Sequence, residues 1–166
     1  MNIQFLKNLF LSTLFLLSSG GASLLSANEA EPMQPAQSAH TNKMKVYKSA
    51  SCGCCGDWIE HMKENGFKLQ VHNTDNLNGI KQKAGLTPRL ASCHTAFING
   101  YVIEGHVPAN DVKRLLAEKP DIKGLTVPGM PSGANVPGME MSPDNAEFDV
   151  LGFKEDGTVQ RWSHYQ

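Results

Sequence analysis

The sequence has no basic cluster and almost no net charge. Its 166 residues include 15 lysine and arginine residues and 16 aspartate and glutamate residues, for a formal net charge of −1. Nucleic-acid binding through phosphate contacts needs a basic patch, so this composition argues against a nucleic-acid partner. A phosphate-binding glycine loop, a Ser-His-Asp order and a paired-carboxylate arrangement are also missing. No common catalytic motif stands out.

The sequence also has little that could hold it in a membrane. The apolar stretch from Leu9 to Leu17 is shorter than the about 20 residues of a spanning helix. Lys7 precedes it, and small residues ending in Leu25-Ser26-Ala27 follow it, which is the order of a secretory signal peptide. We therefore predict a signal peptide over residues 1–27 and a mature protein without a membrane segment. No cysteine lies near this cleavage point, so a lipid-modified cysteine is not available there.

Residues 28–43 lack the apolar residues of a packed core. They are mostly glutamate, proline, glutamine, alanine, serine and asparagine, which predicts a disordered leader. Residues 44–166 then form one domain. A chain of this length can bury a core without disulfides, so the cysteines need not be structural staples.

Residues 44–120 show the periodicities of alternating strands and helices. Alternation predicts strands at 44–48, 67–72, 95–98 and 101–104, and helical spacing predicts helices at 57–65, at 77–84 and from Pro108 to just before Pro120. Asn99-Gly100 between the last two strands predicts a tight hairpin, since both residues tolerate positive φ.

The rest of the chain is a long loop followed by a hairpin. From Asp121 to Asn145 the periodicity stops, and Val127-Pro128-Gly129-Met130 is repeated as Val136-Pro137-Gly138-Met139. Residues 147–153 and 158–162 predict two final strands. The fold class predicted is α/β, with a thioredoxin-like β-α-β-α-β-β-α core, a long Met/Pro/Gly loop and a C-terminal hairpin.

The four cysteines are distributed unevenly. Three fall in Cys52-Gly53-Cys54-Cys55, between a predicted strand and a predicted helix. Unpaired backbone N–H groups and the helix dipole stabilise thiolates there, and the thiolate is both nucleophile and metal ligand. In a thioredoxin-type topology the loop carrying Cys93 lies beside this turn, so Cys93 would complete a set of four sulfurs. Four thiolates are a soft donor set that suits Cu(I) or Zn(II).

Three interpretations of the cysteines compete. Two structural disulfides, in any of three connectivities, would close only small loops at this helix start. A thiol–disulfide oxidoreductase would use Cys52 and Cys55, but a third thiol between them invites unwanted disulfides. A metal site is the interpretation that we favour. Zinc needs only four tetrahedral ligands, whereas copper also accounts for the methionines.

Further ligand candidates are methionines and histidines. Met130, Met139 and Met141 lie in the Pro/Gly-rich loop, where no helical or strand pattern requires them. A thioether is a soft ligand for Cu(I) that cannot form a disulfide, although methionine equally often fills a core. His94 follows Cys93, and His106 follows the hairpin. We take His94, His106, Met130 and Met139 as candidate ligands beside the four cysteines.

Four sequence blocks together resemble a known family. They are Lys48-Ser49-Ala50-Ser51-Cys52-Gly53-Cys54-Cys55, Ser92-Cys93-His94-Thr95, Glu104-Gly105-His106-Val107-Pro108 and Gly124-Leu125-Thr126-Val127-Pro128-Gly129-Met130-Pro131. Residues 44–162 resemble the CopG-like copper-resistance proteins. The resemblance implies a periplasmic, thioredoxin-like protein with a thiolate-bridged multinuclear copper cluster held by Cys52, Cys54, Cys55 and Cys93. It also implies an association with copper-efflux and copper-resistance operons and a proposed Cu(I)/Cu(II) redox role.

The sequence thus predicts a periplasmic copper-binding protein of copper resistance. It would hold Cu(I) for sequestration, transfer or redox cycling, with copper-efflux or copper-chaperone proteins of the periplasm as partners. A copper oxidoreductase activity is left open. The alternatives are a thiol–disulfide oxidoreductase of exported proteins that uses Cys52 and Cys55, and a zinc-stabilised interaction module.

Overall fold

The structure, a computed structural model, describes residues 42–166. The predicted signal peptide and all but the last two residues of the predicted leader lie outside this range. The elements are β1 (Lys43–Lys48), α1 (Gly53–Glu64), β2 (Lys68–Asn73), α2 (Leu77–Lys83), β3 (His94–Ile98), β4 (Tyr101–Glu104), α3 (Ala109–Glu118), β5 (Gly124–Thr126), β6 (Phe148–Phe153) and β7 (Val159–Tyr165). β1 begins at Lys43, one residue earlier than predicted.

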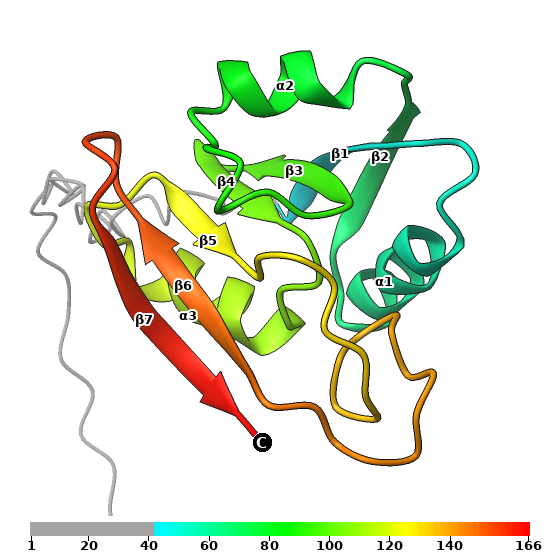
Figure 1. Cartoon of the computed structure of the whole chain (residues 1–166). Coiled ribbons are helices and arrows are strands. Elements are labelled where there is room, and N and C mark those ends of the chain that lie inside the picture. Colours follow the sequence, from blue (N-terminus) through cyan, green and yellow to red (C-terminus); the bar gives the residue numbers. More distant parts are fainter. Residues whose placement is uncertain (1–41) are drawn as a thin grey trace, which may run out of the picture. The chain divides into compact units, whose positions relative to one another are not determined.

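The seven strands form one mixed sheet (Figure 1) in the order β2-β1-β3-β4-β5-β6-β7. β1 pairs in parallel with β2, and β4 with β5, while the other neighbours are antiparallel. The predicted α/β class, the β-α-β-α-β-β-α order up to α3 and the C-terminal hairpin are confirmed.

The prediction of an unbroken loop over 121–145 is wrong at its start. Gly124–Thr126 forms β5, which pairs with β4 on one side and with β6 on the other. All three residues are buried, and a segment this short shows no alternation in the sequence. β5 joins the C-terminal hairpin to the same sheet as the cysteine-bearing elements.

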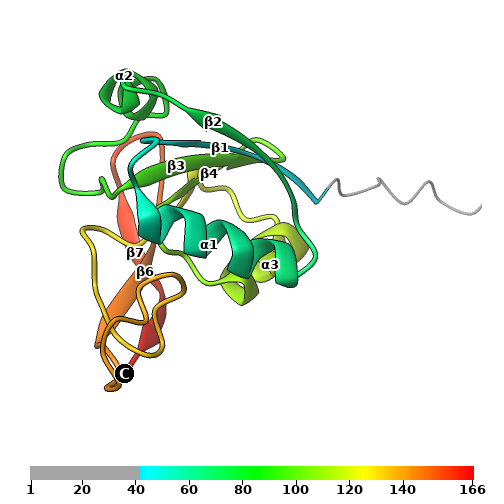
Figure 2. The same cartoon turned by 90° about the vertical axis from the view of Figure 1, so that its right-hand side faces the viewer.

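The helices cover opposite faces of the strands β1–β4 (Figure 2): α1 and α3 lie on one face and α2 on the other. The main core is between the sheet and the helices α1 and α3, where Trp58 and Met62 of α1 and Val112 of α3 are fully buried. Met44 and Val46 of β1 face them. A smaller core under α2 contains Ala84, Leu86, Leu90, Val102 and Phe153.

The predicted hairpin turn is present between β3 and β4. Asn99 has φ 47° and Gly100 has φ 88°, the positive values that a two-residue turn of this kind requires. The turn fixes the pairing of Thr95 with Glu104, which places the start of β3 beside the end of β4.

Among the described residues, no helix has the length and hydropathy needed to cross a bilayer.

His61 of α1 caps the N-terminus of α3. Pro108, the N-cap residue of α3, makes no side-chain cap hydrogen bond, and the backbone N–H of Ala109 instead donates to His61 Nε2 at 3.2 Å. Nε2 can accept this bond only while it is unprotonated. Burial is the main cause that lowers the pKa of His61, and it outweighs the opposing effect of Glu140.

This cap predicts a loss of stability in acid. The folded-state pKa of His61 is below the unfolded value of about 6.5, so its contribution is complete above that pH and is lost as the pH falls below it. We expect His61→Gln to reduce the fall in urea-unfolding free energy between pH 7.5 and pH 5 by about 1 kcal/mol, the usual net contribution of one hydrogen bond. Identical pH dependence in the variant and the wild type would contradict this role.

Candidate metal centre

The three clustered cysteines lie at the N-terminus of α1. Cys52 is the N-cap residue, and Cys54 and Cys55 are in the first turn, because α1 begins at Gly53 rather than at the predicted Asp57. Small residues and cysteines carry no amphipathic period, which explains the error. The first turn contains no acidic side chain, and Cys52 makes no side-chain cap hydrogen bond. No acidic or capping side chain of this turn therefore competes with the sulfurs for the positive end of the helix dipole, which stabilises thiolates there.

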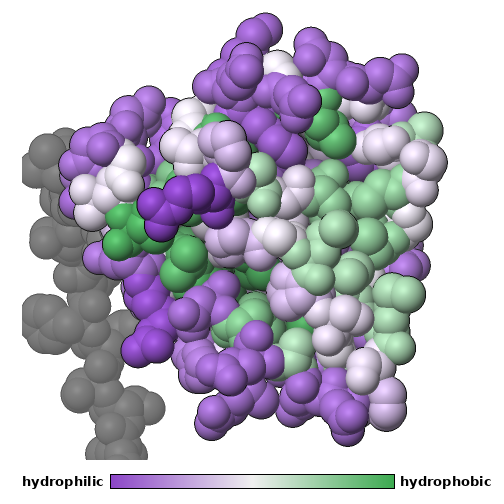
Figure 3. Space-filling view, viewed as in Figure 1, coloured by the Kyte–Doolittle hydropathy of each residue, from purple (hydrophilic) through white to green (hydrophobic). Residues whose placement is uncertain are grey.

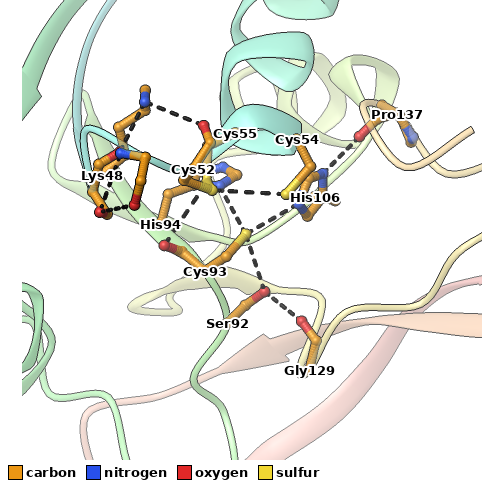
Figure 4. Close-up of a disulfide and its surroundings, with 12 residues drawn as sticks. Lys48, Cys52, Cys54, Cys55, Ser92, Cys93, His94, His106, Gly129 and Pro137 are labelled. Carbon is orange, nitrogen blue, oxygen red and sulfur yellow. Dashed lines mark hydrogen bonds between the residues drawn. A yellow bond between two sulfur atoms is a disulfide. The ribbon is translucent and has the colours of Figure 1, made fainter. Parts of the chain in front are cut away.

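Strand pairing brings the fourth cysteine to the same place. β3 runs antiparallel to β1, and His94 pairs with Lys48, so Cys93 lies beside the turn that follows β1. The Sγ atoms of Cys52, Cys54, Cys55 and Cys93 all lie within 4.8 Å of one another. In Figure 4 the sulfur of Cys93 points toward the α1 cysteines and toward the ring of His106. The predicted convergence is present, and the role of these residues as ligands stays a prediction.

The four cysteines are not chemically equivalent in this structure. Cys52 and Cys55 form a disulfide, while Cys54 and Cys93 are free thiols. The interpretation as two disulfides is therefore wrong, since only one is present in the described residues. Cys54 Sγ lies 3.7 Å from Cys52 Sγ. A disulfide sulfur is not a thiolate ligand, so all four sulfurs become available to a metal only after reduction of this bond.

His106 is held in the orientation of a metal ligand. Its Nδ1–H donates to the carbonyl oxygen of Pro137 at 2.7 Å, which leaves the lone pair on Nε2. That nitrogen lies 3.0 Å from Cys93 Sγ. A backbone carbonyl that fixes the far nitrogen of an imidazole is the usual outer contact of histidine ligands.

His94 also lies close to Cys93. Its Nδ1 is 3.3 Å from Cys93 Sγ, and its ring packs against Trp58 with the ring centroids 4.3 Å apart. The side chain is fully buried, and its Nε2 has no hydrogen-bond partner among the described residues. Cys93, His94 and His106 thus form a second candidate ligand group that shares Cys93 with the first.

Burial keeps these groups uncharged at neutral pH. Burial, followed by the neighbouring Cys54 thiol, raises the pKa of Cys93 to about 11. Burial also lowers the pKa of His106 and holds the pKa of His94 well below its usual value. A cation that binds Cys93 must therefore displace its proton, whereas the imidazoles already offer free lone pairs. The donor set is sulfur and neutral imidazole, which fits a soft metal.

The two repeats of the long loop pack against the two sides of this site. In the first, Gly129 accepts a hydrogen bond from Ser92 Oγ and donates its N–H to Ala91 at 3.1 Å. In the second, Pro137 accepts the His106 hydrogen bond. Gly138 has φ 77°, and a Cβ there would come within 2.7 Å of the Cys54 carbonyl oxygen. Only glycine allows this approach to the start of α1.

The methionines of these repeats have different environments. Met139 belongs to the main core with 8% exposure, whereas Met130 and Met141 are 63% and 80% exposed. In Figure 3 hydrophobic surface gathers over α1 and the loop beside it. A ligand role for Met130 and Met139 stays a prediction.

Sequence reasoning missed two groups that hydrogen-bond to the ligand candidates or to their chain neighbours, the Glu104 carboxylate and the Pro137 carbonyl. Glu104 accepts a hydrogen bond from the backbone of Ser92 and pairs with Lys81. Glu104 ends an apolar strand and stands two residues before His106, and a charge at such a position is the signal that could have identified it. Nothing in the sequence indicates the role of the Pro137 carbonyl, because every residue has a backbone carbonyl group.

Comparison with known proteins gives one family model and two solved structures. The model described as "Protein of unknown function, DUF411" matches residues 90–140. Copper resistance protein CopG, form 2, is 39% identical with a TM-score of 0.70, and the match covers 75% of this chain and 98% of that one. Form 1 of the same protein is 40% identical with a TM-score of 0.69, and the match covers 74% and 96%. No curated protein matches the chain.

Proposed function

Because the chain belongs to the CopG family of copper-resistance proteins, we propose that it binds Cu(I) through Cys52, Cys54, Cys55 and Cys93 as part of copper resistance. The observation that carries the proposal is the convergence of four sulfurs from two distant segments within 4.8 Å. Sulfur donors at this density favour a soft ion over magnesium, calcium or manganese.

More than one copper ion fits the arrangement of donors. The group of four sulfurs and the group of Cys93, His94 and His106 overlap at Cys93. A thiolate has several lone pairs and can bridge two metal ions, so Cys93 would link a copper ion on the α1 side to one on the histidine side. Met130, exposed beside the site, is proposed to contact copper as it enters or leaves, and Met139 is the weaker candidate because it is buried in the core.

The site is proposed to act outside the cytoplasm. The predicted signal peptide over residues 1–27 supports export to the periplasm, where copper-efflux or copper-chaperone proteins would exchange the ion with this protein. The exposed Met130 and Met141 lie on the loop that packs against the site, so a partner docking there would contact soft ligands first. Sequestration, transfer and redox cycling are all compatible with this donor set.

Cys54→Ser tests the copper assignment. We expect the reduced wild-type protein to bind more than one Cu(I), and the variant to lose most of this capacity while it keeps its fold, because Cys54 is a partly exposed free thiol. Anaerobic titration against a Cu(I) chelator, with metal analysis of the same sample, measures both values. Ser51→Ala, an exposed change in the same turn, is the matched control. Unchanged copper stoichiometry in Cys54→Ser would refute the proposal.

A second candidate function is thiol–disulfide exchange on exported proteins. The Cys52–Cys55 disulfide at the start of α1 favours it, since helix N-termini activate such pairs. Insulin-reduction activity that depends on Cys52, in a protein that copper neither binds nor inhibits, would support this function over copper binding. Metal analysis of protein as isolated from cells separates copper from the zinc alternative.

A further inference from the structure

Glu104 is a buried carboxylate at the end of β4. Its side chain is fully inaccessible, yet it accepts three hydrogen bonds: from Lys81 Nζ at 2.5 Å, from the backbone N–H of Ser92 at 2.6 Å and from Thr95 Oγ1 at 2.7 Å. Burying an ionised carboxylate is costly unless its oxygens are fully paired. The three donors satisfy this requirement.

The donors come from three separate segments. Lys81 is on α2, Thr95 is on β3, and Ser92 lies in the connection between them, next to Cys93. The residues immediately before Cys93 belong to no helix or strand. The hydrogen bond from the Ser92 N–H to Glu104 therefore restrains a backbone segment that is not held by the hydrogen bonds of a helix or a strand. On the other side of the same loop, Ala91 and Ser92 are held by Gly129.

We propose that Glu104 is a positioning residue for Cys93: its carboxylate holds the Ser92 peptide and thereby directs Cys93 Sγ to the point between the α1 cysteines and His106. The proposal rests on the proposed copper function. Lys81 has a supporting role, because it neutralises the buried charge. A carboxylate suits this position because its two oxygens can accept from all three donors at once.

Two double variants separate the hydrogen bond from the buried charge. Lys81→Met/Glu104→Leu removes the ion pair and the acceptor for Ser92 N–H. Lys81→Met/Glu104→Gln removes the ion pair but keeps an amide oxygen for Ser92 and an amide N–H for Thr95 Oγ1. Replacing a buried ion pair by neutral residues of similar volume is often neutral for stability. Asp111→Leu removes another buried carboxylate, on α3, which accepts hydrogen bonds from Ser163 and Tyr165.

The first readout is Cu(I) affinity by chelator competition under anaerobic, reducing conditions. We expect the Leu double variant to bind about tenfold more weakly than the wild type, within the range for outer contacts of metal ligands, and the Gln double variant to recover most of this loss. Asp111→Leu should keep wild-type affinity. Equal affinity in the Leu and Gln double variants would overturn the proposal.

The second readout needs no metal. In reduced, copper-free protein, we expect iodoacetamide to label Cys93 several-fold faster in the Leu double variant than in the Gln double variant, since the loop no longer holds the thiol in the site. Mass spectrometry assigns the labelled cysteine. If the wild type binds no copper, the proposed function fails, and equal Cys93 labelling in both double variants rejects the positioning role by itself. If the Leu double variant does not fold, Lys81→Met/Glu104→Gln is compared with the wild type, and a tenfold loss of Cu(I) affinity there would overturn the proposal.

Discussion

Cys93→Ser is expected to reduce Cu(I) binding more than any other single substitution in the site. Cys93 belongs to both candidate ligand groups, so its loss leaves the α1 cysteines without their fourth sulfur and the two histidines without a thiolate. Serine is nearly isosteric and leaves the strand pairing of β3 with β1 intact. We expect Cu(I) capacity to fall further than in Cys54→Ser, and the affinity of the remaining copper to fall at least tenfold, as even changes at outer contacts can cause.

The measurement is anaerobic copper titration of the reduced protein, with circular dichroism to verify the fold. Cys54→Ser is the matched comparison, because Cys54 belongs to only one of the two groups. If the overlap at Cys93 matters, Cys93→Ser loses more copper than Cys54→Ser. A Cys93→Ser protein that retains as much copper as Cys54→Ser would contradict the shared role.

Oxidation of the protein is expected to remove at least half of its Cu(I) capacity. In the oxidised form Cys52 and Cys55 are joined, and only Cys54 and Cys93 remain as thiols. Two of the four sulfur donors are then withdrawn, which leaves one thiol on α1 and one on the loop before β3 to bind copper. Copper titration after reduction with a phosphine, compared with titration after mild oxidation, measures the difference, with thiols counted in both samples.

A double variant provides the control for this experiment. Cys52→Ser/Cys55→Ser lacks both sulfurs of the disulfide, so even after reduction its capacity should remain at the level of the oxidised wild type. Equal copper capacity in the oxidised and reduced wild-type proteins would show that Cys52 and Cys55 are not ligands. The same result would favour a thiol-exchange role for the pair.

The sequence predicts the parts of this molecule that depend on local pattern. The Asn99-Gly100 pair predicts the hairpin turn, and the alternation of apolar residues before and after it predicts β3 and β4. The position of Cys54 at a strand–helix junction follows from a strand on one side and amphipathic spacing on the other. Placing Cys93 beside it required one further assumption, the strand order, and β3 does pair with β1.

The sequence does not predict the features that depend on tertiary contact. β5 is three residues long and is recognisable only by its pairing with β4 and β6. The C-x-x-C spacing identified Cys52 and Cys55 as the pair that an oxidoreductase would use, but it did not decide between this disulfide and a metal site. Met130 and Met139 occupy equivalent places in a sequence repeat, yet one is exposed and the other is in the core. The repeat gives no indication of which copy faces inward.

The donors of the site come from three parts of the chain that meet only through the sheet. An unfolded chain offers the Cys52–Cys55 segment alone, and Cys93 and His106 join it once β1, β3 and β4 have paired. Copper binding at the proposed site would therefore be thermodynamically linked to folding, since an ion bound to all three parts stabilises the native state over the unfolded one. The copper-free protein is expected to be the form that proteases and chaperones encounter most readily.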